Sequence, residues 1–499
     1  MNDTMLLQLD SPMHLLLLGM IVLATMAYIY FFSAFSPRGK NDKSKAAPPV
    51  VDEKTKLVAI PGGVFHVFDR MRADDSHAWH LELSRTLGKF VTVPFGSTRF
   101  VFCYDYKVAR KMLDDPQHQK WHEGYSFIDG IAGGDNLFSS EGFRSKHARK
   151  ATNPAFHPRN VEHMMNVADS ILKDWITEQE RTNGGKSGSF VVDATDEMQR
   201  LTIDVIGEIG FGYKLSKKER ELVLKNLQIT YREYSVAVRK NPMRKLLPIL
   251  YREARRARVA SKELQALARQ ILDTTRSKES TNVDSTGNIK TILQFIVGNN
   301  DYKNDAERIR DMLVYVAGGY ETTGATIGWT LYELARNPES QTWLRSELLK
   351  IKDPKERRYC QALKHVIRES IRLHLVASIT SIRTLECDVP LPDIGGYMPA
   401  KSIVAVPGYT IHRDSRVFEK PDEFLPRRWE EPTSAMNQAW IGFGIGRRSC
   451  QGQSLANAEL SVVLAKLCAD YEWTVEEEGD EEYYVTLKRV GTLLRATKV

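Results

Sequence analysis

Cys450 lies in the segment Phe-Gly-Ile-Gly-Arg-Arg-Ser-Cys-Gln-Gly, residues 443–452, whose residue types suit a thiolate that binds a metal. A thiolate is the metal ligand, and its negative charge needs backbone N–H donors and restricted solvent. Gly446 and Gly452 let the backbone wrap close to the sulfur and to a flat ring. Residues 454–469 have helical periodicity, so the cysteine precedes a helix start, where the helix dipole favours an anion. The alternative is a buried structural cysteine, which does not explain the Gly and Arg residues around it.

A second candidate segment, Gly-Gly-Tyr-Glu-Thr-Thr at 318–323, falls inside a long helical pattern from Asp305 to Arg336. Two adjacent glycines in a helix interior cost about 1 kcal/mol each relative to alanine, so they need a reason. A helix that opens locally beside a cofactor is one reason. The alternative for the threonines is that their hydroxyls bond back to carbonyls one turn earlier.

Glu369 and Arg372 are three residues apart in the helical pattern Gln361–Leu373, so their side chains share one face and can form an ion pair. Alone this is a weak signal, because most such pairs are surface salt bridges. The segment Phe-Leu-Pro-Arg-Arg-Trp at 424–429 follows it.

In this order, the segments resemble the cytochrome P-450 superfamily, in particular its eukaryotic microsomal type. The cysteine segment matches the pattern F-x-x-G-x-R-x-C-x-G at every specified position. The resemblance implies haem b (iron protoporphyrin IX) with Cys450 as the axial thiolate ligand of the iron. The cofactor-binding residues that it implies are Cys450, Arg448, Phe443, Gly446, Gly452, Arg383 and Arg149.

The same resemblance assigns roles on the two helices. Thr322 would hydrogen-bond the iron-bound dioxygen, and Glu321 would feed protons toward it through water. Glu369 and Arg372 would join Arg428 in a structural triad that holds the cysteine loop, with Trp429 at the last aromatic position of the F-x-P-x-R-F pattern.

Two positions depart from the family pattern. Ser145 stands four residues before Arg149, where the family usually has Trp or His, which leaves one propionate contact to His147 or Lys146. Leu375 stands near the place of a proline, which reshapes the pocket wall without touching the chemistry.

The implied activity is a monooxygenase reaction that inserts one oxygen atom of O₂ into a lipophilic substrate. Electrons would come from an external NADPH-dependent flavoprotein reductase, with a cytochrome b-type protein as a further donor, because 499 residues leave no room for a second redox domain. Basic residues near the expected proximal face suit an acidic partner: Arg144, Lys146, Arg149, Lys150 and Arg447. Two rival functions remain, a haem-thiolate isomerase or dehydratase that rearranges a peroxide without O₂ activation, and a haem-binding carrier or sensor.

The elements that must position these residues are predominantly helical. Helical spacing also occurs at 160–180 and 252–276, and short strand-like runs at 90–94, 99–103 and 402–406. The fold class is therefore mainly α with a minor β part, a cytochrome P-450 fold by resemblance. Hydrophobic residues make up 42% of the chain and charged residues 27%, which is ordinary globular composition. A net charge of +7 with no basic run interleaved with aromatics argues against nucleic-acid binding.

The N-terminal region predicts a membrane anchor. Leu15–Phe35 carries no charge and is long enough to span a bilayer as a helix, and basic residues follow it. We therefore expect a transmembrane segment at 1–36, a basic proline-containing linker at 37–60 and a catalytic domain at 61–499. These features predict a single-pass protein of the endoplasmic reticulum with its catalytic domain in the cytosol, and five irregularly spaced cysteines agree with a reducing compartment. Residues 243–251, apolar with basic neighbours, are a candidate second membrane contact.

Overall fold

The computed structural model describes residues 50–71, 73, 75–95, 98–182, 188–238, 241, 243–281 and 290–499. The fold is mainly helical with small sheets, as expected. The α-helices are α2 Gly63–Met71, α3 Ser76–Leu87, α4 Tyr106–Asp114, α5 Phe127–Ala132, α6 Gly142–Thr152, α7 Val161–Thr182, α8 Ala194–Phe211, α9 Lys217–Tyr231, α11 Met243–Leu246, α12 Arg252–Thr281, α13 Ile292–Val297, α14 Asp305–Arg336, α15 Pro338–Lys350, α16 Gln361–Leu373, α17 Gly408–Ile411, α18 Ser434–Ala439 and α19 Gln453–Asp470.

The strands form one larger sheet and three small ones. The six-stranded sheet has the order β1-β2-β3-β9-β6-β4, and the three-stranded sheet has the order β10-β13-β5, while β11 with β12 and β7 with β8 are two-stranded. Their bounds are β1 Val58–Ala59, β2 Phe90–Phe95, β3 Thr98–Cys103, β4 Gln119–Lys120, β5 Ser189–Asp193, β6 Ile379–Thr384, β7 Val389–Leu391, β8 Gly396–Met398, β9 Ile403–Pro407, β10 Tyr471–Glu477, β11 Asp480–Tyr483, β12 Leu487–Val490 and β13 Leu493–Lys498.

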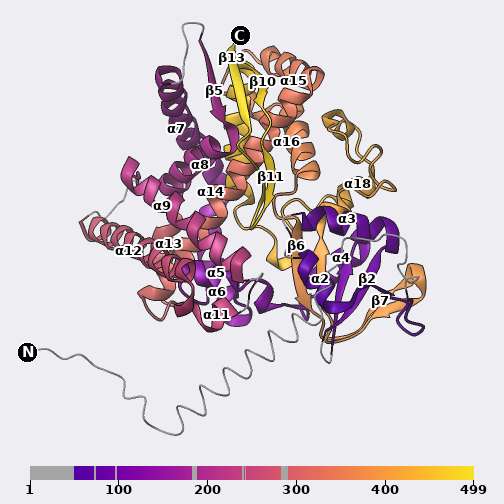
Figure 1. Cartoon of the computed structure of the whole chain (residues 1–499). Helices are drawn as coiled ribbons and strands as arrows, with labels where there is room; N and C mark the ends of the chain where they lie inside the picture. The colour runs from indigo at the N-terminus through magenta and orange to yellow at the C-terminus, as the bar shows by residue number, and fades with distance from the viewer. Residues whose placement is uncertain are drawn as a thin grey trace, which may run out of the picture. The chain divides into compact units, whose positions relative to one another are not determined.

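Helix α14 is the central element of the helical part, and Figure 1 shows α8 and α12 beside it. Asn304 caps its N-terminus, accepting a hydrogen bond from the Glu307 N–H at 3.1 Å. Its contact with α8 is close because α14 has glycines where the two backbones meet. A Cβ at Gly324 would lie 2.8 Å from the backbone nitrogen of Gln199, too close for any other residue to fit without movement.

The large sheet carries the N-terminal edge of the folded part. β1 pairs in parallel with β2, and Leu57 just before it is fully buried. β1 lies inside the range 37–60 that we expected to be a linker. The described part of that range, from Val50 on, therefore packs against the catalytic domain.

The expected membrane helix at Leu15–Phe35 lies outside the described residues. Within the described part of the chain, no helix is both long and apolar enough to cross a membrane. The predicted N-terminal transmembrane helix is therefore not confirmed.

Candidate functional site

The cysteine loop is held by its own backbone. The Cys450 N–H donates to the Phe443 carbonyl at 2.8 Å, and a short 3₁₀ turn, η9 Gly446–Arg448, lies between them. Gly446 has φ +71°, and a Cβ there would lie 2.4 Å from the Leu113 carbonyl oxygen. Both its backbone conformation and the approach of α4 therefore require glycine at this position.

The Cys450 side chain is accessible, although it lies deep within the protein. Burial raises the pKa of its thiol, while an N–H donated by Gly452 and the charge of Arg149 act in the opposite direction. Gly452 is also the N-cap of α19, so the sulfur sits at a helix N-terminus as the sequence predicts. A bound metal cation deprotonates a coordinating thiol outright, so this donor set suits a metal–thiolate bond.

Four cationic side chains interact with one another beside this loop: Lys120, Arg149, Arg383 and Arg448. Burial lowers the pKa of Arg448 to about 10, and the charges of Arg149 and Arg383 add to this effect. Glu141 opposes it, with its Oε1 3.9 Å from Arg448 Nε. Among the described residues, Arg448 Nε has no hydrogen-bond partner. A cofactor with two carboxylates would offset this excess of positive charge, so the cluster fits the haem propionates.

Lys120 is the member of this cluster that the sequence reasoning missed. It lies directly opposite Arg383 in the β4–β6 pair, and like charges opposite each other destabilise a sheet unless an anion lies between them. Its ammonium donates to the Phe138 carbonyl at 2.7 Å and lies 4.3 Å from the centre of the Tyr125 ring. Burial lowers its pKa well below the usual value, and the neighbouring arginines add to the shift. Only strand pairing could reveal this residue, because Lys120 is 263 positions from Arg383 in the chain.

The two departures from the family pattern have structural explanations. Ser145 is buried, and its hydroxyl accepts a hydrogen bond from the Arg448 guanidinium, so it orients one member of the cation cluster. His147 instead stacks on Phe143 with 3.6 Å between ring centroids, and its Nδ1 is 2.9 Å from the Phe143 carbonyl oxygen. Leu375 is 1% exposed and lies in the core.

The two adjacent glycines of α14 have different surroundings. A Cβ at Gly319 would lie 3.0 Å from Ile206 of α8, so this glycine permits close helix packing. Gly318 is exposed, and nothing lies within 4 Å of where its Cβ would be. The α-helix is continuous from Asp305 to Arg336, so the expected local opening is not present.

Thr322 and Glu321 lie on different sides of α14. The half-buried Thr322 donates its hydroxyl hydrogen to the Gly318 carbonyl at 2.7 Å, which is the back-bonded arrangement considered above. The oxygen keeps lone pairs that can accept a further hydrogen bond. Glu321 is only 2% exposed and accepts a hydrogen bond from Lys488 of β12 at 3.3 Å.

The structure brings Glu369, Arg372 and Arg428 together. Arg372 donates to both carboxylate oxygens of Glu369 at 2.9 Å, and Arg428 Nε donates to Oε1 at 3.0 Å. The Trp429 indole N–H is a further donor, 2.9 Å from Glu369 Oε2. Although burial opposes ionisation, these hydrogen bonds and charges hold the pKa of Glu369 below its ordinary value. Three side chains, Arg372, Arg428 and Trp429, therefore surround the buried Glu369 carboxylate.

His412 connects this group to the cysteine loop and was not singled out from the sequence. Its Nε2 accepts the N–H of Ile441 at 2.8 Å, and its Nδ1 lies 3.2 Å from the Arg372 carbonyl oxygen. Burial, with the charge of Arg372, lowers its pKa to about 3, so the ring is neutral. A neutral imidazole can accept at Nε2 and donate at Nδ1, which these two contacts require.

The basic residues of the expected proximal face separate into two kinds. Arg144 forms two hydrogen bonds with the fully buried Asp311 of α14, at 2.9 and 2.8 Å, so it belongs to the core. Lys146, Lys150 and Arg447 are exposed. These three remain available to a partner.

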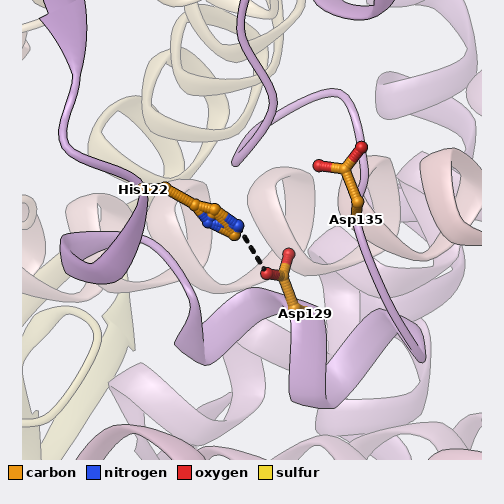
Figure 2. A group of neighbouring side chains, drawn as sticks. All are labelled: His122, Asp129 and Asp135. Atoms are coloured by element: carbon orange, nitrogen blue, oxygen red, sulfur yellow. Dashed lines mark ion pairs between the residues drawn. The ribbon is translucent and has the colours of Figure 1, made fainter.

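Residues 122–139 are cross-linked by polar side chains. Figure 2 shows the His122 ring directed at the Asp129 carboxylate, with Nε2 3.3 Å from Oδ2, and Asp135 nearby. Asp129 also accepts hydrogen bonds from Asn136 at 2.8 Å and Ser139 at 2.5 Å. These contacts tie η1 (His122–Gly124) to α5 and to the turn that follows it.

Comparison with known proteins gives the family. The model of the family "Cytochrome P-450" matches residues 63–497. The chain belongs to the cytochrome P-450 family. It is similar to curated proteins named cholesterol side-chain cleavage enzyme, mitochondrial: that of Rattus norvegicus is 25% identical over 455 residues, covering 85% of this chain and 84% of the relative. The Bos taurus protein is 26% identical over 446 residues (84% and 83%), and the Homo sapiens protein is 28% identical over 345 residues (65% and 64%).

Family membership makes this cytochrome P-450 an oxidoreductase, a haem-thiolate monooxygenase that uses a lipophilic substrate, O₂ and a redox partner. The expected location is wrong. The relatives are named as mitochondrial enzymes, which conflicts with a protein of the endoplasmic reticulum. The predicted location rested on a charge-free stretch followed by basic residues, a pattern that does not identify the organelle.

Proposed function

We propose that this cytochrome P-450 oxidises a sterol-like lipophilic substrate, with Cys450 as the thiolate ligand of haem iron. One observation carries the proposal: the accessible sulfur at the start of α19 lies beside four cations that a two-carboxylate cofactor would neutralise. Bound haem would supply the chemistry of O₂ reduction. The protein would supply the ligand, the propionate contacts and the protons.

The residues of the site divide this work. Arg149, Arg383, Arg448 and Lys120 would hold the propionates, because they form the cation cluster. Phe443, Gly446 and Gly452 would shape the loop around the sulfur. Thr322 would offer a hydroxyl on the open side of α14 beside Gly318, and Glu321 would carry protons from the other side. Glu369, Arg372 and Arg428 would be architectural, because they hydrogen-bond one another and the chain that leads to the cysteine loop.

A sterol-like substrate agrees with the names of the relatives and with partly buried apolar side chains at the edge of the core. Phe127, Val376 and Val485 are apolar and only partly buried, and they pack on the edge of the large core. A rigid hydrocarbon such as a sterol gains affinity by covering surfaces of this kind.

We further propose that electrons derived from NADPH arrive through a separate acidic redox protein, which docks on Lys146, Lys150 and Arg447. Their exposure and like charge support this assignment. An intact Glu321–Thr322 pair favours O₂ activation over peroxide isomerisation, which needs no proton supply.

The test uses the purified holoenzyme. CO should bind the reduced protein with the spectrum of a thiolate-ligated haem, and Cys450→Ala should lose that spectrum. Sterols should shift the haem spectrum, and product should require NADPH, an acidic redox partner and O₂. Rearrangement of a peroxide substrate without NADPH, with no oxygen transferred to a second compound, would instead establish the isomerase, and haem binding without any turnover would establish the carrier.

A further inference from the structure

Glu321 is a buried carboxylate with Lys488 as its ion-pair partner and the Tyr231 hydroxyl as a further neighbour. Its Oε1 accepts a hydrogen bond from Lys488 Nζ at 3.3 Å, and both side chains are largely shielded from solvent. Its Oε2 is buried and has no hydrogen-bond partner among the described residues. A buried carboxylate oxygen without a partner costs free energy, so an ion pair that served stability alone would be expected to satisfy it.

A polar cavity of about 190 Å³ adjoins this carboxylate. Its walls come from α8, α9, α14 and the β11–β12 hairpin, and they include Glu321, Lys488 and the buried Tyr231. Glu221 and Lys225, which also line it, are exposed and place its mouth at the protein surface. A polar space of this size has room for several water molecules.

Two consecutive residues of α14, Tyr320 and Glu321, line the cavity. No described atom lies within 4 Å of where a Gly318 Cβ would be, and Thr322, one turn later on the same face, is half-buried. Glu321 is the neighbour of Thr322 in the chain but lines the cavity. On an α-helix consecutive residues point about 100° apart, so the Glu321 carboxylate can line the cavity and still lie next to Thr322.

We propose that Lys488 is a positioning residue for proton delivery, which holds the Glu321 carboxylate at the inner end of the polar cavity and stabilises it each time it gives up a proton. The inference rests on the proposed function, because reduction of O₂ consumes protons. In each cycle one proton moves from bulk solvent through the cavity water to Glu321 Oε2, and one moves from the neutral carboxyl toward Thr322. No electrons move, and Glu321 returns to the carboxylate beside the Lys488 ammonium.

The alternative is that the ion pair only ties the β11–β12 hairpin to α14. The Lys488→Met variant distinguishes a role in proton delivery from a purely structural ion pair. Lys488→Arg is the conservative variant, which keeps the positive charge. Lys89→Met is the matched control. Lys89 also neutralises a buried carboxylate, that of Asp105 at 2.7 Å, but outside the site.

Two measurements on the holoenzyme are needed. The first is the infrared band of the protonated Glu321 carboxyl at neutral pH, isolated as a difference against Glu321→Gln. Lys488→Met should strengthen this band, because a buried carboxylate without its cation takes up a proton. The second is hydrogen peroxide released per NADPH oxidised, which should rise at least about tenfold in Lys488→Met, because a carboxyl that releases its proton less readily is a poorer proton donor.

Lys488→Arg should stay near wild type in both measurements, and Lys89→Met should change neither. A stronger carboxyl band with unchanged peroxide release would overturn the proposal and leave a structural ion pair. A rise in peroxide that Lys89→Met shares would also overturn it. If the wild-type enzyme consumes no O₂ with NADPH and its redox partner, the proposed function itself fails and this inference fails with it.

Discussion

Replacing Trp429 by phenylalanine should destabilise the protein by about 2.5–4 kcal/mol. The indole is 2% exposed, and its N–H donates to Glu369 Oε2 at 2.9 Å. A hydrogen bond to a charged group contributes about 1.5–3 kcal/mol. Phenylalanine cannot donate, so the buried carboxylate keeps its arginine donors but loses this one.

The ring also contributes packing. The Arg368 guanidinium lies 3.9 Å from the centre of the Trp429 ring system, and Phe418 packs edge-on with 6.1 Å between centroids. Phenylalanine keeps one six-membered ring in the site, so the loss of packing and of the cation–π contact adds about 1 kcal/mol.

Trp473→Phe is the matched control. Trp473 is 1% exposed and packs edge-on against Phe190, but its N–H donates to the neutral Leu467 carbonyl at 3.1 Å. A neutral hydrogen bond contributes about 0.5–1.5 kcal/mol, so this variant should lose about 1 kcal/mol less.

The assay is urea unfolding of the oxidised holoenzyme, followed by circular dichroism and haem absorbance, with haem content measured beforehand. Equal costs for the two variants would refute the reasoning, because the charge on Glu369 would then add nothing. Trp429→Phe should also unfold the haem site first, because Glu369 accepts the Leu425 N–H at 2.9 Å and so fixes the chain leading to the cysteine loop.

Three further predictions concern other parts of the molecule. Thr322→Ala should keep its haem but divert electrons to peroxide, lowering product per NADPH by about tenfold; an unchanged yield would show that the hydroxyl has no role in O₂ reduction. Glu459 of α19 is buried, and burial raises its pKa well above the ordinary value of 4.5. The folded state therefore holds this proton where the unfolded state has lost it, so the free energy of unfolding falls as pH rises above about 4.5. Glu459→Gln should remove this pH dependence, so the variant's free energy of unfolding in urea should exceed that of the wild type by more at pH 8 than at pH 5. A pH-independent difference would contradict the raised pKa of Glu459. Leu246, Ile249 and Leu250 are 66–71% exposed, and replacing all three with serine should weaken binding to anionic vesicles by at least about tenfold, since burying one leucine contributes about 1.5–3 kcal/mol. Equal flotation of both proteins would show that residues 243–251 do not touch lipid.

The main helices and the cysteine loop could be predicted from local patterns. The bounds of α14 and α16 match the predicted Asp305–Arg336 and Gln361–Leu373, because a long amphipathic repeat and an Asn304 cap are local signals. The strands β2, β3 and β9 begin or end within one residue of the predicted runs. The N-terminal anchor and its location were inferred from local hydropathy in the same way, and there the comparison with mitochondrial relatives contradicts the location.

The sequence by itself therefore determined the fold class and the family, and it predicts Cys450 as the thiolate ligand, because these depend on residues close together in the chain. Only the tertiary structure decided which distant side chains meet. Lys120 faces Arg383 through strand pairing, Trp429 reaches Glu369 across 60 residues, and Lys488 reaches Glu321 across 167. It also decided that Gly318 faces open space while Gly319 packs on α8. Such contacts form only when elements far apart in the chain pack together, so a local sequence pattern does not reveal which residues will meet.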